Sequence, residues 1–334
     1  MWKLLSLLQK HLVWSIPLAM LAGLLFGLAT DAAFLRWTIL PLTFLMVYPM
    51  MVTMNVRELL NPGGNKLQGV TLALNFLVMP AIGYGIGLLF FADQPMVRLA
   101  LLLTSLLPTS GMTISWTGFA KGNVPAAVKM TVIGLIAGSL LAPLYLNVLL
   151  GAVVEIPLLQ VFMQIGLIVF LPLVLGTVTQ RWLVKSYGER EFNQRFKPKF
   201  PPFSTLGVLG IVFVSIALKA KSIFANPAML PNLLLPLVLL YTINFIISTL
   251  VGKSLFKRSD AIAFVYGTVM RNLSIALAIA LGVFREKGAD AALLIALAYI
   301  VQVQAAAWYV KLTDRLFGAP LSSPAMASES VKGG

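Results

Sequence analysis

Arg271 is the residue whose chemistry is hardest to explain by folding alone. It lies near the middle of an apolar stretch from about Ala261 to Phe284. At about 1.5 Å per helical residue, this places Arg271 near the midplane of a hydrocarbon core roughly 30 Å thick. A cation without a partner at that depth costs between about 2.5 and 17 kcal/mol. An intramembrane charge of this kind therefore indicates a functional site.

No acidic residue of the chain is expected at the same depth. All eleven Asp and Glu residues fall at predicted helix ends, in loops or in the tail. The counter-charge for Arg271 is therefore expected from an anionic substrate, because a guanidinium favours carboxylate or phosphate-like groups that accept two parallel hydrogen bonds. Lys129, about five residues into its own predicted span, is a second candidate cation; the alternative is that its long stem reaches the interface. Burial disfavours a charged lysine, which makes Lys129 the candidate for proton coupling.

Two spans carry polar interruptions in corresponding places. Residues 106–117 contain Pro108, which removes a backbone donor, together with several hydroxyl groups; the alternative is a simple proline kink. Residues 267–274 are polar but contain no proline. A pair of interrupted helices is typical of the midplane site of a secondary transporter, and helix N-termini exposed at such breaks favour anions. The candidate substrate-binding residues are Thr109, Ser110, Thr113, Lys129, Arg271, Asn272 and Ser274, with Asn75 and Asn244 from neighbouring spans.

The composition indicates an integral membrane protein. The 334 residues are 59% hydrophobic and 11% charged, whereas a soluble domain carries about 25% charged residues. The net charge of +14 is dispersed among loops, which argues against nucleic acid binding. With no cysteine, disulfides, thiolate metal sites and cysteine nucleophiles are excluded. No nucleophile–base pair or phosphate-binding loop stands out, so we predict neither an enzyme nor a resident metal or cofactor.

The apolar runs predict an all-α membrane protein with about ten transmembrane helices. Residues 185–199 are expected to form a solvated basic linker. Of the 25 Lys and Arg residues, seventeen fall on the side that holds both termini, six on the other side and two within spans. This asymmetry predicts cytoplasmic termini, in the plasma (inner) membrane of a prokaryote. The predicted spans are 12–30, 36–54, 68–92, 97–120, 124–151, 157–183, 203–224, 231–256, 260–284 and 289–312.

Short matches between the two halves predict an internal repeat. One match pairs Asn75-Phe76 with Asn244-Phe245, and another pairs Lys121-Gly122 with Lys287-Gly288. Five helices in each half force the two halves into opposite topology. We therefore expect two inverted repeats, residues 1–151 and 152–317, followed by a disordered cytoplasmic tail at 318–334.

Two segments resemble a known superfamily. Residues 108–123, from Pro108-Thr-Ser-Gly-Met to Lys-Gly-Asn123, resemble the fourth-helix motif of the bile acid:sodium symporter and arsenite-carrier superfamily. Residues 271–280, beginning Arg271-Asn-Leu-Ser, look like its ninth-helix motif. The resemblance implies a five-plus-five inverted repeat with a panel and a core domain. It also implies that broken helices 4 and 9 cross near the midplane, and that substrates are organic anions or arsenite.

The departures from the superfamily pattern concern the coupling and substrate positions. Sodium symporters of this group carry a glutamate and a glutamine where Gly267 and Arg271 stand, although Thr131 is kept. Arsenite carriers have a cysteine and a glutamate where Thr109 and Ser274 stand. These positions therefore support neither sodium coupling nor arsenite thiolate chemistry. The candidate ion-coupling residues that remain are Lys129, Thr131 and Gln302.

These patterns lead to a functional hypothesis with several alternatives. The leading one is a secondary active transporter that moves a small or organic anion by alternating access, with fixed cations in place of bound sodium. The alternatives are an arsenite or antimonite efflux permease, a sodium:organic-anion symporter with altered sites, a channel, and a membrane receptor that does not transport. The predicted partners are the anion and the lipid bilayer; the sequence leaves the oligomeric state open.

Overall fold

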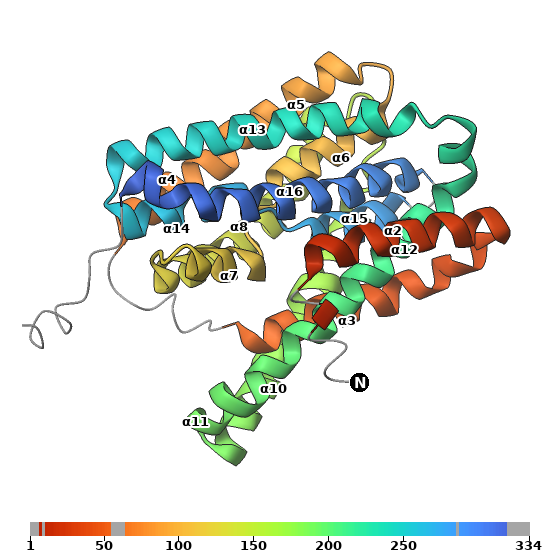
Figure 1. Cartoon of the computed structure of the whole chain (residues 1–334). Coiled ribbons are helices and arrows are strands. Elements are labelled where there is room, and N and C mark those ends of the chain that lie inside the picture. Colours follow the sequence, from red (N-terminus) through yellow and green to blue (C-terminus); the bar gives the residue numbers. More distant parts are fainter. Residues whose placement is uncertain (1–6, 9–10, 55–63, 285–286, 319–334) are drawn as a thin grey trace, which may run out of the picture.

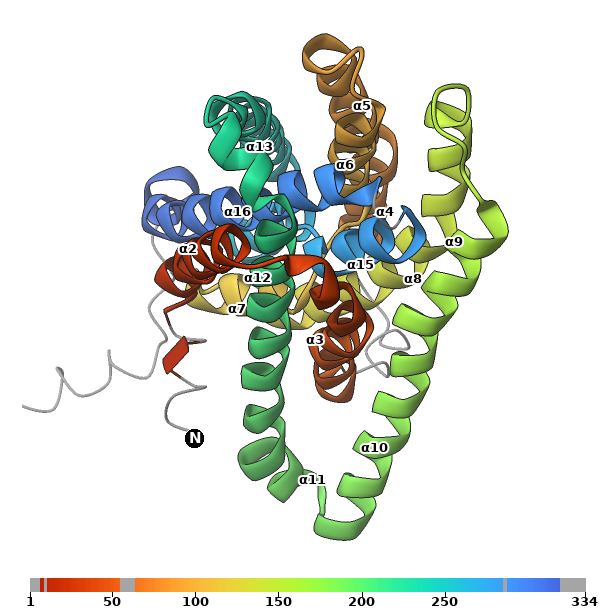
Figure 2. The same cartoon turned by 90° about the vertical axis from the view of Figure 1, so that its right-hand side faces the viewer.

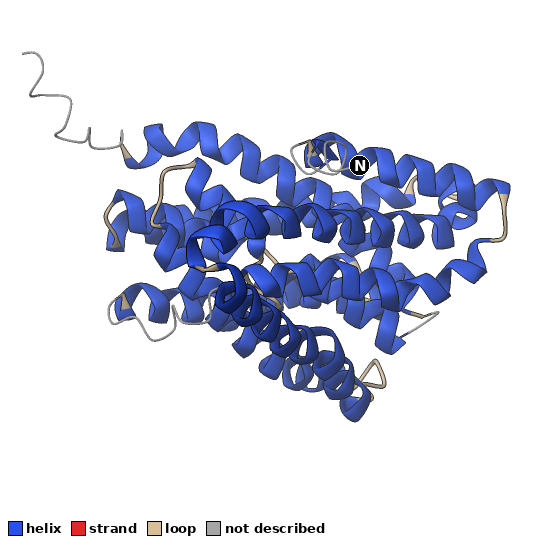
Figure 3. Cartoon of the chain, turned by 90° about the horizontal axis from the view of Figure 1, so that it is seen from below, coloured by secondary structure: helices blue, strands red, loops and turns tan. Residues whose placement is uncertain are grey.

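The computed structural model describes residues 7–8, 11–54, 64–284 and 287–318. Within these ranges every regular element is a helix, as Figure 3 shows, so the all-α prediction is confirmed. All of the predicted tail at 318–334 except Gly318 lies outside the described residues.

Seven of the described helices are long and apolar enough to cross a membrane, and three shorter apolar helices fall inside other predicted spans. The chain is therefore a multi-pass membrane protein, while the ten-span inverted repeat stays a prediction. The shorter helices are Trp14–Ala29, Pro95–Leu106 and Leu273–Phe284. The seven longer ones are Ala32–Thr53, Asn65–Phe90, Val124–Leu150, Leu158–Tyr187, Glu189–Ala225, Met229–Leu255 and Gly288–Phe317.

One group of helices packs through glycines, and we call it the first helix group (Figure 2). A Cβ at Gly27 of α2 would lie 2.2 Å from a backbone oxygen of α12, and a Cβ at Gly207 of α12 would lie 2.5 Å from the backbone of α3. Small residues let the three helices approach closely. The group comprises α2 (Leu12–Ala29), η1 (Ala32–Thr38), α3 (Ile39–Thr53), α9 (Leu158–Ile165), η4 (Gly166–Phe170), α10 (Leu171–Tyr187) and α12 (Phe200–Ala225).

The remaining helices form the second helix group, which contains both predicted interruptions. In Figure 1, α5, α6, α13 and α16 lie alongside one another, and these helices contact each other in the structure. Most of the fully buried side chains belong to this group. It comprises α4 (Asn65–Ala73), η3 (Leu74–Val78), α5 (Met79–Phe90), α6 (Pro95–Leu106), α7 (Gly111–Phe119), α8 (Val124–Leu150), α13 (Met229–Leu255), α14 (Arg258–Val269), α15 (Leu273–Phe284) and α16 (Gly288–Phe317).

Residues 185–199, which were expected to form a solvated basic linker, are mostly exposed and connect α10 to α12 partly through short helical turns. After α10 ends at Tyr187, the chain forms the short helical turns α11 (Glu189–Glu191), η5 (Phe192–Phe196) and η6 (Lys197–Lys199) before α12 begins. Phe192 is buried, and the rings of Tyr187 and Phe196 pack 4.8 Å apart. Most of the charged residues of this segment are exposed, and the aromatic residues anchor its turns.

Candidate functional site

Both predicted interruptions are breaks in the structure, and the two breaks pair with each other. α6 ends at Leu106 before α7 begins at Gly111, and α14 ends at Val269 before α15 begins at Leu273. The Thr109 N–H donates to the Met270 carbonyl at 2.7 Å, and the Asn272 N–H donates to the Leu107 carbonyl at 2.8 Å. This antiparallel bridge satisfies backbone groups that the helix ends leave free. We call this paired segment the crossing.

Thr109 holds a left-handed backbone conformation at the crossing. Its φ is +60°, which is unusual for a β-branched residue and costs about 1–3 kcal/mol. Its hydroxyl donates to the Pro108 carbonyl at 2.7 Å and lies 3.4 Å from the Thr131 carbonyl on α8. Gly134 makes this fit possible, because a Cβ there would lie 2.6 Å from the Thr109 hydroxyl. The strain is maintained by packing between the break and α8.

Three of the predicted binding residues cap the helices that begin at the crossing. The Ser110 hydroxyl accepts from the Met112 N–H at 3.3 Å, and the Thr113 hydroxyl accepts from the Ser110 N–H at 3.1 Å, which forms a capping box for α7. Asn272 Oδ1 accepts from the Ile275 N–H at 3.2 Å at the start of α15. The other end of the same carboxamide, Asn272 Nδ2, is buried and finds no hydrogen-bond partner among the described residues.

The backbone N–H and carbonyl groups of Arg271 both form hydrogen bonds with the Gln302 side chain at the crossing. Its N–H donates to Gln302 Oε1 at 2.7 Å, and Gln302 Nε2 donates to its carbonyl at 3.3 Å. Tyr241 steadies the glutamine by donating to the same Oε1 at 2.9 Å. The Arg271 side chain is only 2% exposed, and its Nη1 donates to Asn75 Oδ1 at 3.0 Å. Its Nη2 finds no hydrogen-bond partner within the described ranges.

Asn75 and Asn244 reach the end of α14 from two different helices. Asn75 Nδ2 donates to the Gly267 carbonyl at 3.0 Å, and Asn244 Nδ2 donates to the Thr268 carbonyl at 3.1 Å. Both carbonyls belong to the last turn of α14, where the break removes the usual intrahelical donors. Asn75 belongs to the π-helical turn η3, a widened geometry that is frequent at functional sites.

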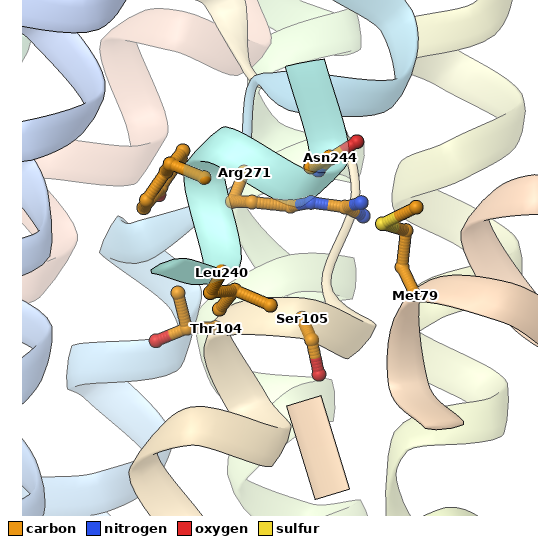
Figure 4. A pocket seen from close by; sticks show the side chains of 7 residues that line it. Met79, Thr104, Ser105, Leu240, Asn244 and Arg271 are labelled. Carbon is orange, nitrogen blue, oxygen red and sulfur yellow. The ribbon is translucent and has the colours of Figure 1, made fainter. Parts of the chain in front are cut away.

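The Arg271 guanidinium points into a narrow pocket, as Figure 4 shows. The pocket leaves about 0 Å³ for a molecule the size of water, whereas ordinary ligand sites offer roughly 300–1,000 Å³. The crossing is therefore closed around the guanidinium in this conformation. The pocket lies within the second helix group, and its lining comprises Met79, Thr104, Ser105, Leu240, Tyr241, Asn244 and Arg271.

The charge of Arg271 is not neutralised by a carboxylate. None of the acidic residues that the structure describes is buried. Asp290 pairs with Lys219 at 2.6 Å, and Asp314 pairs with Arg258 at 2.6 Å. Asp260 accepts from Asn123 at 2.7 Å. These contacts lie away from the crossing, so the groups around the guanidinium within the described ranges are dipolar and carry no negative charge.

Other predicted residues lie apart from this pocket. Lys129 is half-buried on α8 and does not line it. The Thr131 hydroxyl donates to the Ala127 carbonyl at 2.8 Å, and the half-buried Ser274 shares a 2.7 Å hydrogen bond with the Tyr299 hydroxyl. The structure thus gathers Arg271 with the two asparagines and Gln302, and Thr109 with Thr131.

Sequence reasoning missed Tyr241, Thr104 and Ser105. Tyr241 precedes Asn244 by three residues, which places both on one face of α13. Thr104 and Ser105 lie in the last turn of α6, directly before the break. The sequence signal that could have identified them was their proximity to Asn244 and to Pro108, which were already candidate site residues.

Comparison with known proteins agrees with this architecture. The chain is 25% identical over 310 residues to the arsenical-resistance protein Acr3 of Corynebacterium glutamicum, which covers 86% of this chain and 83% of that protein. It is 31% identical over 140 residues to the sodium/bile acid cotransporter 7 of Danio rerio, covering 42% of this chain and 38% of that protein. Residues 40–226, more than half of the chain, match the Sodium Bile acid symporter family. The crossing of two broken helices thus lies in a membrane protein that belongs to the Sodium Bile acid symporter family.

Proposed function

We propose that this membrane transporter carries a small or organic anion by alternating access, without sodium at the positions that its sodium-coupled relatives use. One observation carries the proposal. Arg271 is 2% exposed at the crossing, and none of the described acidic residues is buried beside it. An uncompensated positive charge inside a membrane protein favours an anionic ligand.

The size of the electrostatic attraction between Arg271 and an anion supports a role for this residue in ligand affinity. An anion at roughly 6 Å from the guanidinium, in an effective dielectric of about 20, gains about 3 kcal/mol. This corresponds to roughly a hundredfold in affinity. The helix N-termini at Ser110 and Asn272 add to the attraction, because each carries a partial positive charge.

The two helix groups suggest how access alternates. The crossing belongs to the second group, which packs against the first through α16, α15 and α12. Movement of one group against the other exposes a fixed midplane site to each side in turn. We infer that the closed pocket around Arg271 belongs to one end of this cycle.

The test begins with a substrate screen. Purified protein is heated with small carboxylates, phosphates and oxyanions, each in sodium and in choline salts, and stabilising anions are then assayed for uptake into proteoliposomes. We expect wild-type uptake to be equal in sodium and choline at constant potential. We expect Arg271→Gln to lower uptake roughly a hundredfold.

Arg98→Gln is the matched control. Arg98 is also a buried arginine with an unpartnered Nε among the described residues, but it lies in the first turn of α6. The Arg98→Gln variant should retain uptake within a few-fold of wild type. Uptake by Arg271→Gln equal to wild type would overturn the proposal, and sodium-stimulated uptake would support the symporter alternative.

Arsenite or antimonite efflux is a second candidate. It is favoured by the similarity to two arsenical-resistance proteins. Two features speak against it: arsenite is largely uncharged at neutral pH, and the chain has no cysteine to form an arsenic–thiolate bond. Expression in arsenite-sensitive cells separates the two functions, since resistance that persists in Arg271→Gln would favour arsenite over an anion.

A further inference from the structure

The outer face of α10 changes from apolar to basic along one helical stripe. Residues three, four or seven positions apart share a face of a helix, and on this face the exposed residues run from aliphatic side chains through a tryptophan to a lysine. Exposed aliphatic side chains on a membrane helix contact lipid, and tryptophan gathers at the membrane interface. The stripe therefore marks the level at which α10 leaves the hydrocarbon core. It comprises Leu171, Val174, Leu175, Val178, Trp182 and Lys185.

The turn that follows α10 lies at the depth of the lipid headgroups. α10 continues for five residues past Trp182, to Tyr187, which is about 8 Å at about 1.5 Å per residue. A bilayer about 40–45 Å thick with a hydrocarbon core of about 30 Å has a polar layer of about 5–8 Å on each side. Figure 2 shows that α10 and α11 extend beyond the end of α3, which belongs to the same helix group. The turn thus enters the layer that headgroups occupy.

This part of the chain carries an excess of positive charge. Residues 181–199, which we call the basic hairpin, contain six Lys and Arg residues and two Glu residues, a net charge of +4. Five of the six cations are exposed. Glu191 and Arg195 form a 4.0 Å ion pair with both side chains more than half exposed, and an ion pair of this kind is weak. Most of the positive charge of the basic hairpin therefore faces outward.

Aromatic residues give the basic hairpin a defined shape. Phe192 is buried in a cluster with Val52 of α3 and Leu183 of α10. The rings of Tyr187 and Phe196 pack 4.8 Å apart across the turn. A packed turn presents its cations to a partner at a lower cost in conformational entropy than a loose segment, because less of the chain has to be ordered on binding.

We propose that the basic hairpin is a binding surface for anionic phospholipid. Its charge selects anionic lipid over zwitterionic lipid, in which a choline or ethanolamine group offsets the phosphate. Clusters of about four to eight Lys and Arg residues beside a membrane span are typical of such surfaces. The partner is a lipid of the surrounding bilayer and not the transported anion, so this inference goes beyond the proposed function and does not rest on it.

A dye on the hairpin measures lipid binding at the surface concerned. The chain has no cysteine, so Asn193→Cys, at an exposed position of η5, can be labelled selectively with an environment-sensitive dye. The labelled protein is titrated in neutral detergent with phosphatidylglycerol or phosphatidylcholine. We expect half-saturation at a concentration at least about tenfold lower for phosphatidylglycerol, and loss of this preference at about 1 M salt, which screens exposed charges.

Removal of hairpin cations should abolish the preference. Each cation near an anionic membrane surface is worth roughly fivefold in affinity, so loss of three should weaken phosphatidylglycerol binding by at least about tenfold. The melting temperature in neutral detergent should stay close to that of wild type, because the three side chains are exposed. The hairpin variant combines Arg181→Gln, Lys185→Gln and Arg190→Gln.

A matched control removes the same charge from the second helix group. Lys66, Lys253 and Lys257 are exposed there, and the variant with glutamine at all three positions should bind phosphatidylglycerol like wild type. Equal losses in the control and the hairpin variant would assign the effect to total charge. A dye signal that responds equally to the two lipids, or to neither, would show that the hairpin does not select anionic lipid. Competition by millimolar glycerol 3-phosphate would indicate a site for soluble phosphate. Each of these three results overturns the proposal.

Discussion

Replacement of Asn75 by Asp is the sharpest test of the charge at the crossing. The change is nearly isosteric, but it places a carboxylate where Asn75 Oδ1 now lies 3.0 Å from Arg271 Nη1. At that distance, with an effective dielectric of about 20, the two charges attract by about 5 kcal/mol. The aspartate therefore stays beside the guanidinium and cancels its charge.

The effect on ligand affinity follows from the same electrostatics. The attraction of about 3 kcal/mol for an anion at roughly 6 Å disappears when the net charge falls to zero. We expect Asn75→Asp to bind the transported anion roughly a hundredfold more weakly, as measured by anion titration of the purified protein and by uptake into proteoliposomes. Folding should persist, because the new ion pair offsets the lost hydrogen bond to the Gly267 carbonyl.

Asn75→Leu is the matched control, because it has a similar volume and no charge. It removes both hydrogen bonds of the asparagine, which costs about 3 kcal/mol of stability, but it leaves the positive charge in place. We therefore expect a lower melting temperature with anion affinity close to wild type. Anion affinity of Asn75→Asp equal to that of wild type would refute the reasoning.

Two further predictions concern packing and motion. Gly134→Ala should destabilise the protein by about 1–3 kcal/mol in thermal melts, because its Cβ would lie 2.6 Å from the Thr109 hydroxyl. Gly69→Ala is the control: its Cβ would meet nothing within 4 Å, so this change should be neutral or stabilising. Equal melting temperatures of the two variants would contradict the account of Thr109. Lys219 of α12 and Asp290 of α16 form a 2.6 Å ion pair between the two helix groups. The chain has no cysteine, so cysteines introduced at these two positions can be joined selectively. We expect a cleavable thiol-specific cross-linker between them to stop uptake, and its cleavage to restore uptake. Full uptake by the cross-linked protein would show that α12 and α16 do not separate during transport.

The breaks could be predicted from the sequence because their causes are local. Pro108 removes a backbone donor and the hydroxyls beside it offer caps, so the first break is a property of its own segment. The second break has no proline, but the polar run at 267–274 marked its place. The all-helical class followed in the same way from apolar runs of membrane-spanning length.

The contacts of Arg271 could not be predicted, because they depend on packing between distant segments. Asn75 and Arg271 are 196 residues apart, and their contact requires the π-helical turn η3. A long apolar span gives no local signal for such a turn. The absence of Lys129 from the lining of the pocket could not be predicted either, because depth in the membrane does not specify which face of α8 a side chain occupies.

A positive charge that is fixed in the protein changes the energetics proposed for the transport cycle. A dissociable cation adds its own gradient to the driving force, whereas a side chain returns with the protein and adds none. If Arg271 stays in its pocket through the cycle, a monovalent anion crosses with its full charge. The membrane potential then acts on it with about 2.3 kcal/mol per 100 mV. A cytoplasm that is negative inside drives such an anion outward, so uptake would require a co-transported proton. A fixed charge at the crossing therefore favours export of an anionic substrate.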